Sequence, residues 1–396
     1  MSTPCFDTIW QSHTTGRKDQ QLEELTPDLV FGHEATMALI LDQLEKADGP
    51  RLPPEKLFLV VDHFAPASSG LFADIARSFR LFCDQRSLPY HLHEGIGHRL
   101  MLESPRVKSG MLVIGADSHT TTIGGKAALG IGLGSTDVLA VLMTGTIWLK
   151  RPTVSRILLQ GTLPAWVEPK DVVLHLLGKH GQAGFLGEVM EFVDSSDQTL
   201  DIEQRSVLTN MCVEMGAVSA LVVDDDAVLT GPVHRTVAVE LDGLQSLIAC
   251  PGAPDDVIPA SAAGAVKVDC ANLGSCASGG LTDLKVAAAM LSNRTVAQGS
   301  ALLVTPATRS VFLSANQDGI IDQIVAAGAT LLNPSCGACG GIDKGIPGTG
   351  DIVVSTAPRN YSARARIGSQ VYLASTATTV ASAIAGHLVD PAEVMP

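Results

Sequence analysis

Leu57-Phe-Leu-Val-Val61, followed at once by Asp62-His63, is a continuous apolar run that ends in two polar residues. Five consecutive apolar residues are typical of a strand that is covered on both faces, as in a parallel sheet. Met111-Leu-Val-Ile-Gly115 repeats the pattern and leads to Asp117-Ser118-His119, and the helical segment 69–86 lies between the two runs. This alternation predicts an α/β fold with polar side chains at the carboxyl edge of a parallel sheet.

The same alternation of strand, loop and helix continues along the 396 residues, a length that suits two or three domains. The composition changes near Lys150, and 224–259 is acidic and rich in turn residues. We therefore predict three α/β units of three-layer α/β/α type around a central site, over 1–152, 153–232 and 233–396.

Composition limits the function. With 46% hydrophobic and 17% charged residues the chain is globular, and a formal net charge of −14 argues against nucleic-acid binding by its surface as a whole. The N-terminus has no secretory pattern, and the apolar stretch 127–149 is interrupted by Ser135 and Asp137, which predicts a buried helix with its entry loop. Eight irregularly spaced cysteines indicate reduced thiols and a cytoplasmic location.

An Asp and a His follow the end of each of the two predicted strands, 57–61 and 111–115. For any single histidine, a hydrogen-bonded loop residue is the simpler explanation. The repetition, Asp62 with His63 and Asp117 with His119, favours an acid–base or anion-binding site, and His98 in Glu94-Gly-Ile-Gly-His98 lies between the two.

Cys336 and Cys339 form a Cys-x-x-Cys among turn residues, within Leu332-Asn-Pro-Ser-Cys336-Gly-Ala-Cys339-Gly-Gly-Ile342. The pair alone could be half of a zinc site, a redox dithiol or two cluster ligands. Cys276 lies on a second glycine-rich loop, after a strand predicted over 265–270. Three such thiols fit a 4Fe-4S cluster better than a closed four-ligand zinc site, and Cys270 is the rival ligand.

A glutamate in an apolar segment and a group of arginines each have both a structural and a functional interpretation. Glu214, within the apolar segment 208–216, is either a satisfied buried acid or a catalytic one. Arg359, Arg364 and Arg366 follow a predicted strand at 352–355 in the same unit as the cysteines, so we expect them to bind substrate carboxylates rather than form a solvated patch.

Together these segments resemble the aconitase superfamily, over nearly the whole chain and in a fixed order. The closest likeness is to the large subunits of the isopropylmalate isomerase, homoaconitase and dimethylmalate dehydratase group. The motifs that carry the resemblance are Val61-Asp-His-Phe-Ala-Pro66, Glu94-Gly-Ile-Gly-His98, Gly115-Ala-Asp-Ser-His-Thr120, Asn210-Met-Cys-Val-Glu214, Gly274-Ser-Cys276, Cys336-Gly-Ala-Cys339 and Arg359-Asn-Tyr-Ser-Ala-Arg364.

The resemblance implies a role for each motif residue. Cys276, Cys336 and Cys339 would hold a 4Fe-4S cluster whose fourth iron is open to substrate. Acid–base work would fall to Asp62, His63, Asp117 and His119, with His98 beside them. Asn210 and Glu214 would orient water, and Ser118, Arg359 and Arg364 would bind the substrate. The implied reaction is dehydration and rehydration of a hydroxy di- or tricarboxylic acid.

The resemblance also implies a partner. Full-length relatives end in a swivelling domain that supplies a serine base, and this chain stops at Pro396 without one. We therefore expect a separate small subunit and little activity from the chain alone. Within the family, 3-isopropylmalate dehydratase is the expected type, and a homoaconitase, a dimethylmalate dehydratase or a specialised relative is the alternative. Arg99 and Ser278 stand where glutamine and asparagine are usual.

Two hypotheses of other classes are a non-catalytic iron or redox sensor and a mononuclear metal or zinc protein. A sensor needs only the cysteines, so the two Asp/His pairs and the arginines count against it. Iron and acid-labile sulfide content would separate a mononuclear site from a cluster.

Overall fold

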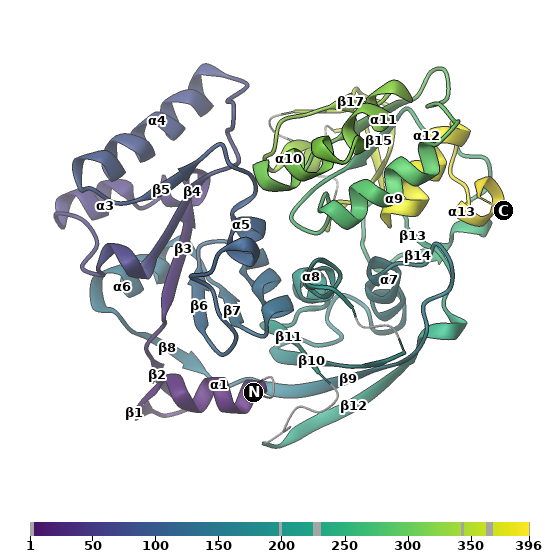
Figure 1. Cartoon of the computed structure of the whole chain (residues 1–396). Helices are drawn as coiled ribbons and strands as arrows, with labels where there is room; N and C mark the ends of the chain where they lie inside the picture. The colour runs from purple at the N-terminus through teal and green to yellow at the C-terminus, as the bar shows by residue number, and fades with distance from the viewer. Residues whose placement is uncertain (1–3, 198–199, 225–230, 342–343, 362–366, 396) are drawn as a thin grey trace.

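The computed structural model describes residues 4–197, 200–224, 231–341, 344–361 and 367–395 (Figure 1). Within these ranges the strands form four sheets, and most strand pairs outside the hairpins are parallel. In Figure 1 the N-terminal sheet lies at the left, the second sheet at the lower right and the third at the upper right. The predicted α/β character is thereby confirmed.

The first sheet is parallel throughout and has the order β5-β4-β3-β6-β7. Its strands are β3 (Leu29–His33), β4 (Leu57–Val61), β5 (Tyr90–Leu92), β6 (Leu112–Gly115) and β7 (Leu129–Gly132). The helices of this part are α1 (Phe6–His13), α2 (Glu34–Met37), α3 (Leu41–Lys46), α4 (Gly70–Gln85), α5 (Gly97–Glu103), α6 (Ser135–Thr144) and the 3-10 segments η1 (Pro54–Lys56) and η2 (Ser118–Lys126). Both predicted strands are present, and each ends at its Asp-containing motif.

A small antiparallel sheet, β1-β2-β8, lies beneath the first one (Figure 1). Its strands are β1 (Thr14–Asp19), β2 (Leu22–Leu25) and β8 (Ile147–Lys150). The apolar stretch 127–149 therefore contains β7, α6 and the start of β8, rather than one buried helix and its entry loop. Among the described residues, no helix is both long and apolar enough to cross a bilayer.

The second sheet has the order β11-β10-β9-β12 and is also parallel. It contains β9 (Thr153–Gly161), β10 (Glu188–Ser196), β11 (Ser219–Asp224) and β12 (Val233–Glu240), with α7 (Pro169–His180), α8 (Ile202–Asn210) and η3 (Met211–Met215). The predicted boundary between 232 and 233 separates β12 from β9, with which it pairs over most of its length. Strand pairing favours a boundary after Glu240, and the division into three units otherwise stays a prediction.

The third sheet has seven strands in the order β14-β13-β19-β18-β15-β16-β17. These are β13 (Leu247–Ala249), β14 (Val257–Pro259), β15 (Cys270–Leu273), β16 (Ala301–Val304), β17 (Thr330–Leu331), β18 (Ile352–Ser355) and β19 (Gln370–Ala374). The strand predicted over 265–270 begins only at Cys270, because the residues that pair with β16 and β18 are Cys270 to Leu273.

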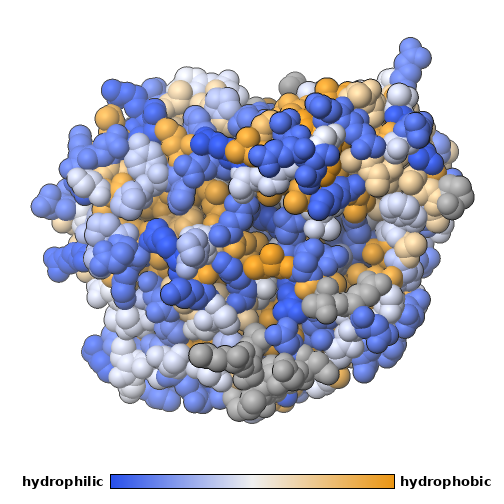
Figure 2. All heavy atoms as spheres, viewed as in Figure 1, coloured by the Kyte–Doolittle hydropathy of each residue, from blue (hydrophilic) through white to orange (hydrophobic). Residues whose placement is uncertain are grey.

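The helices of the third unit are α9 (Leu281–Leu291), α10 (Arg309–Gln317), α11 (Ile320–Ala326), α12 (Thr376–Ala385) and α13 (Pro391–Val394), with the 3-10 turns η4 (Leu241–Gly243), η5 (Ala260–Ala262) and η6 (Gly337–Gly340). In Figure 1, α7 and α8 lie between the second sheet and this unit. Figure 2 shows hydrophilic residues over much of one face, with hydrophobic residues scattered among them.

The apolar cores are shared between the sheets. One buried cluster combines residues of the first sheet, such as Leu59 and Ile114, with Val193 and Leu221 of the second. Another joins the second sheet to Ala277, Cys339 and Ala357 of the third unit. The second sheet therefore shares apolar contacts with both the first sheet and the third unit.

Candidate active site

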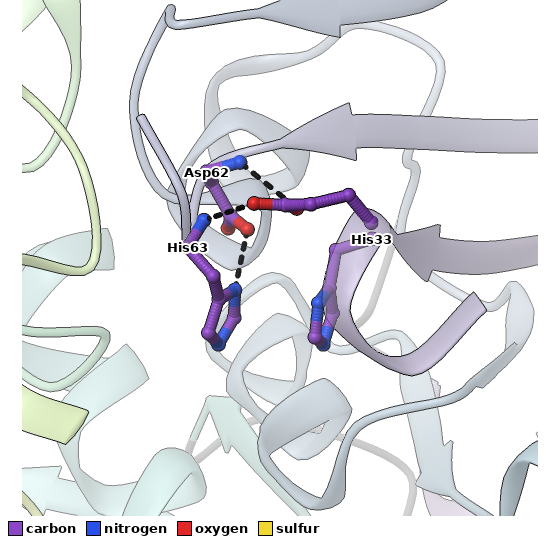
Figure 3. A group of neighbouring side chains, drawn as sticks. His33, Asp62 and His63 are labelled. Atoms are coloured by element: carbon purple, nitrogen blue, oxygen red, sulfur yellow. Dashed lines mark hydrogen bonds and ion pairs between the residues drawn. The ribbon is translucent and has the colours of Figure 1, made fainter. Parts of the chain in front are cut away.

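Asp62 and His63 form a fixed pair at the end of β4 (Figure 3). Nδ1 of His63 lies 2.7 Å from Oδ1 of Asp62, and the other carboxylate oxygen accepts the backbone N–H of Gly97 at 2.7 Å. Burial alone would raise the pKa of Asp62, but the charge and hydrogen bond of His63 hold it at about 2. Burial would lower the pKa of His63, yet Asp62 raises it to about 10. At neutral pH the pair is therefore a carboxylate and an imidazolium.

Glu34 hydrogen-bonds to the backbone of the Asp62–His63 pair. Its carboxylate accepts the backbone N–H groups of Asp62, His63 and Phe64, at 3.2, 2.8 and 2.6 Å. Burial and the charge of Asp62 raise the pKa of Glu34. Glu34 thus fixes the turn after β4 through hydrogen bonds to the main chain.

Asp117 is the centre of a second group, at the start of η2. Its carboxylate accepts the backbone N–H of His119 at 2.7 Å, and Nε2 of His98 lies 3.4 Å from the same oxygen. Burial opposes ionisation, but His98, His119 and His33 hold the pKa of Asp117 well below its usual range. The predicted association of His98 with the Asp/His pairs is therefore present in the structure.

His119 connects this group to Glu214 and Cys276. Its Nε2 lies 3.2 Å from Oε1 of Glu214. Burial would lower the pKa of His119, but the charge of Cys276 and hydrogen bonds to Asp117, Cys276 and Glu214 raise it well above the usual value. Its three partners therefore all favour the protonated ring.

His33, at the end of β3, belongs to the site but was not predicted. Its ring is buried and stacks on that of His63, with centroids 4.0 Å apart and planes at 11° (Figure 3). Its Nε2 is 3.3 Å from Oδ2 of Asp117, so His33 contacts both Asp/His pairs. The sequence carried a signal: Leu29-Val-Phe-Gly-His33 is a third apolar run that ends in a histidine, followed by Glu34.

Arg359 lies where the second and third units meet. Its Nε donates to Oε1 of Glu214 at 2.6 Å, and its Nη2 donates to Oγ of Ser118 at 3.1 Å. One guanidinium therefore joins residues from all three predicted units. Arg364 and Arg366 lie outside the described residues.

Asn210 and Glu214 lie on two consecutive elements. Asn210 is the last residue of α8, and Glu214 lies in the 3-10 turn η3. The Asn210 side chain donates to Oγ1 of Thr122 at 2.8 Å, while its Oδ1 is buried and has no hydrogen-bond partner among the described residues. A buried amide oxygen without a donor is suited to receiving one from a ligand.

The three predicted cluster cysteines lie together. The backbone N–H of Cys336 donates to the carbonyl oxygen of Asp62 at 3.0 Å, which places the thiol loop beside the Asp62–His63 pair. A hydrogen bond to Cys339, burial, and the charges of Cys339 and Cys276 raise the pKa of Cys336 well above its usual value. Three crowded thiols of this kind become thiolates readily only beside a cation or metal.

Cys270 is not part of this group. It begins β15, whereas Cys276 follows the carboxyl end of the same strand. Burial raises its pKa to about 12, and the charged neighbours that add to this effect are Asp351 and Asp269. The rival ligand thus lies at the other end of the sheet.

Arg99 joins the three units close to the site. It follows His98 on α5 and is only 3% exposed, with Nη1 donating to Oγ of Ser206 on α8 at 2.8 Å. Its Nη2 is 3.7 Å from Oε1 of Glu203, whose carboxylate accepts the N–H groups of Leu281 and Thr282 at the start of α9. The Cys276 loop leads directly into α9, so Arg99 supports that loop through Glu203.

We expect Arg99→Gln to lower the free energy of unfolding by about 2 kcal/mol, because it leaves Glu203 without its buried cation and removes a charged hydrogen bond. The melting temperature, measured by differential scanning calorimetry, should fall by a few degrees. Arg77→Gln on the exposed face of α4 is the matched control and should change it by less than one degree. Equal melting temperatures for both variants would show that the Arg99 contacts add no stability.

Comparisons with known proteins identify the family of this chain. The model of the aconitase family (aconitate hydratase) matches residues 7–230 and 252–386. The chain is 32% identical to the probable methanogen homoaconitase large subunit of Methanosarcina mazei, over 93% of this chain and 99% of that protein. It is 34% identical to the 3-isopropylmalate dehydratase large subunit of Campylobacter hominis, over 94% of each.

A solved structure has the same fold. The crystal structure of Thermococcus kodakaraensis aconitase X, in its holo-form, superposes with a TM-score of 0.55 at 12% identity, covering 85% of this chain and 84% of that one. At this identity the similarity concerns the fold alone. From the family match and the two relatives, which are similar over almost their full length, we conclude that this chain belongs to the aconitase family.

Proposed function

We propose that this chain is the large subunit of a hydro-lyase that dehydrates a hydroxy di- or tricarboxylic acid and rehydrates it at the neighbouring carbon, with a substrate of the 3-isopropylmalate type. The observation that carries the proposal is that two Asp/His pairs, three thiols and Arg359 meet at one place. Relatives named 3-isopropylmalate dehydratase large subunit support the substrate type, and a relative named homoaconitase large subunit is the alternative.

The donor set fits an iron–sulfur cluster. Cys276, Cys336 and Cys339 lie together on turn segments, and imidazoles and carboxylates complete the surroundings. We propose that these thiols hold a 4Fe-4S cluster, which supplies a Lewis acid at an iron without a cysteine ligand. A cytoplasmic location belongs to the same proposal, because the thiols must stay reduced.

The acid–base steps would fall to the Asp/His pairs. Loss of hydroxide from a carbon needs a proton donor. The pKa of His63 is raised to about 10, and that of His119 is also raised, so both rings are suited to donating a proton. Their partners Asp62 and Asp117 hold each ring in one orientation and stabilise its charge. Asp62–His63 and Asp117–His119 would therefore protonate the leaving hydroxide and, in the reverse direction, take up a proton from water.

The substrate would be bound through its carboxylates. Arg359 presents a guanidinium that is held in place by Glu214 and Ser118, a geometry suited to a carboxylate that replaces or shares these contacts. Asn210 and Glu214 would orient water. The second clamp, Arg364, remains a proposal from the sequence alone.

We further propose a small-subunit partner, since the relatives that match over nearly their full length are named large subunits. By the resemblance described above, that partner would supply the swivelling domain and the serine base that removes the carbon-bound proton.

The proposal is tested by anaerobic reconstitution with iron and sulfide. The loaded chain should give a cluster signal in electron paramagnetic resonance after one-electron reduction, and that signal should shift when 3-isopropylmalate is added. A shift with homocitrate alone would favour the homoaconitase type. A cluster whose signal responds to neither acid would favour a sensor, and the absence of a cluster would refute the proposed cofactor.

A further inference from the structure

Lys170 is a buried cation with few partners. It is the second residue of α7 and is 4% exposed. Its Nζ donates to the carbonyl oxygen of Ala357 at 2.7 Å. Within the described part of the chain no carboxylate lies within 4.0 Å of this nitrogen, although an ammonium has three N–H groups to donate.

Lys170 lies near the loops that carry the proposed cluster ligands. The side chain lines a cavity of about 330 Å³ together with Ala277 and Ser278, which directly follow Cys276. Its acceptor Ala357 lines a second cavity with Cys339. The hydrogen bond to Ala357 and the shared cavity with Ala277 and Ser278 therefore place Lys170 near both thiol-bearing loops.

The charged groups that affect the pKa of Lys170 include two of the proposed cluster ligands. Burial lowers the pKa of Lys170 to about 8, and the charge that opposes this most strongly is that of Cys339, followed by Asp171, Asp283 and Cys276. Asp171 does not neutralise Lys170 directly, because its carboxylate accepts the backbone N–H groups of Glu168 and Leu247. Burial also raises the pKa of Asp171 to about 7.

A buried ammonium without a paired carboxylate is costly unless another negative charge compensates it. Three thiolates that bind a 4Fe-4S cluster would provide such a charge, and cluster sulfurs accept N–H hydrogen bonds. The carboxylates of Asp171 and Asp283 contribute negative charge near Lys170, but both accept hydrogen bonds from other groups. The cluster would add a further negative charge on the side of Cys276 and Cys339.

We propose that Lys170 is a positioning residue for the iron–sulfur cluster: its ammonium serves as the buried counter-charge behind Cys276 and Cys339 and raises the reduction potential of the cluster. This inference rests on the proposed function, since it requires that the chain hold a cluster. The physical reason is that an added electron makes the cluster more negative, and a nearby fixed cation stabilises that state.

The test compares the full chain with its Lys170→Met and Lys170→Arg variants after anaerobic reconstitution. The midpoint potential is measured by redox titration with detection by electron paramagnetic resonance. Lys170→Met should make reduction at least tenfold less favourable at a given potential, a shift of about 59 mV for one electron. Lys170→Arg should stay close to the wild type. Lys56→Met removes a lysine that also donates to a backbone carbonyl, away from the thiols, and should leave the potential unchanged.

An unchanged potential in Lys170→Met would overturn the inference, and so would equal shifts in Lys170→Met and Lys170→Arg. Circular dichroism of the cluster-free forms checks folding, and Lys170→Gln replaces the methionine variant if that variant does not fold. A folded Lys170→Met that holds no cluster, beside a Lys170→Arg that does, supports the inference. A wild-type chain that binds no cluster refutes the proposed cofactor instead.

Discussion

Replacing any one of Cys276, Cys336 and Cys339 with alanine should abolish cluster assembly and lower hydro-lyase activity by at least about a thousandfold, measured with the small subunit present. The reason is that, in the proposed cluster, each thiolate would bind a different iron, so losing one would leave two ligands for the cluster. Iron and acid-labile sulfide per chain, together with the visible spectrum, provide the measurement. The effect should be equal for the three positions, although they lie on two loops.

Cys270→Ala is the matched control for this series. It removes a thiol from β15, six residues before Cys276, yet its surroundings contain Asp351 and Asp269 rather than the other thiols. We expect it to bind iron and sulfide like the wild type. A Cys270→Ala variant without a cluster, or a Cys276→Ala variant with a full one, would contradict the three-cysteine assignment.

Asp62→Asn should have the second largest effect, a fall in kcat of about a hundredfold to ten-thousandfold, which is the usual contribution of a positioned acid or base. The amide keeps the shape of the side chain but removes the charge that raises the pKa of His63 to about 10. Burial then acts on the imidazole without that opposing charge, so we expect His63 to lose its proton at a much lower pH. Steady-state kinetics report the fall in rate, and nitrogen-15 spectra of the histidines report the change in protonation.

The control for this variant is Asp28→Asn, which alters a second Asp–His pair outside the site. Nε2 of His13 lies 2.6 Å from Oδ2 of Asp28, a distance similar to that in the Asp62–His63 pair. We expect Asp28→Asn to keep kcat within about twofold, since Asp28 joins α1 and the loop before β3 to Leu112 at the start of β6, away from the site. An Asp62→Asn enzyme with wild-type activity would mean that this pair has no part in catalysis.

Much of the site could be predicted because its signals are local in the sequence. The apolar runs before Asp62 and Asp117 are continuous, and a parallel strand places the residue after it at a known edge of the sheet. The cysteines could be predicted as ligands because glycine-rich turns flank them. His33 was missed for the opposite reason: its run is short, contains Gly32, and offers a single histidine rather than a pair.

The features that could not be predicted depend on contacts between residues that are distant in the sequence. That β12 pairs with β9 could not be read from 233–240, because its alternating pattern suits either neighbouring sheet. The contact of Arg99 with Glu203 joins residues that are far apart in the chain, and neither has a local pattern that points to the other. Lys170 is the second residue of α7, and its contact with Ala357 joins residues of different units that no local pattern connects.

The apolar core that continues from the first sheet into the second constrains how this protein can be recombined with its relatives. Leu59 and Ile114 pack in one cluster with Val193 and Leu221, so no boundary near 152 separates two independent sets of side chains. A chimera that exchanges the N-terminal segment alone would bring together two surfaces that did not evolve as a matched pair. A successful exchange would therefore have to carry β10 and β11 along with the Asp62 and Asp117 loops.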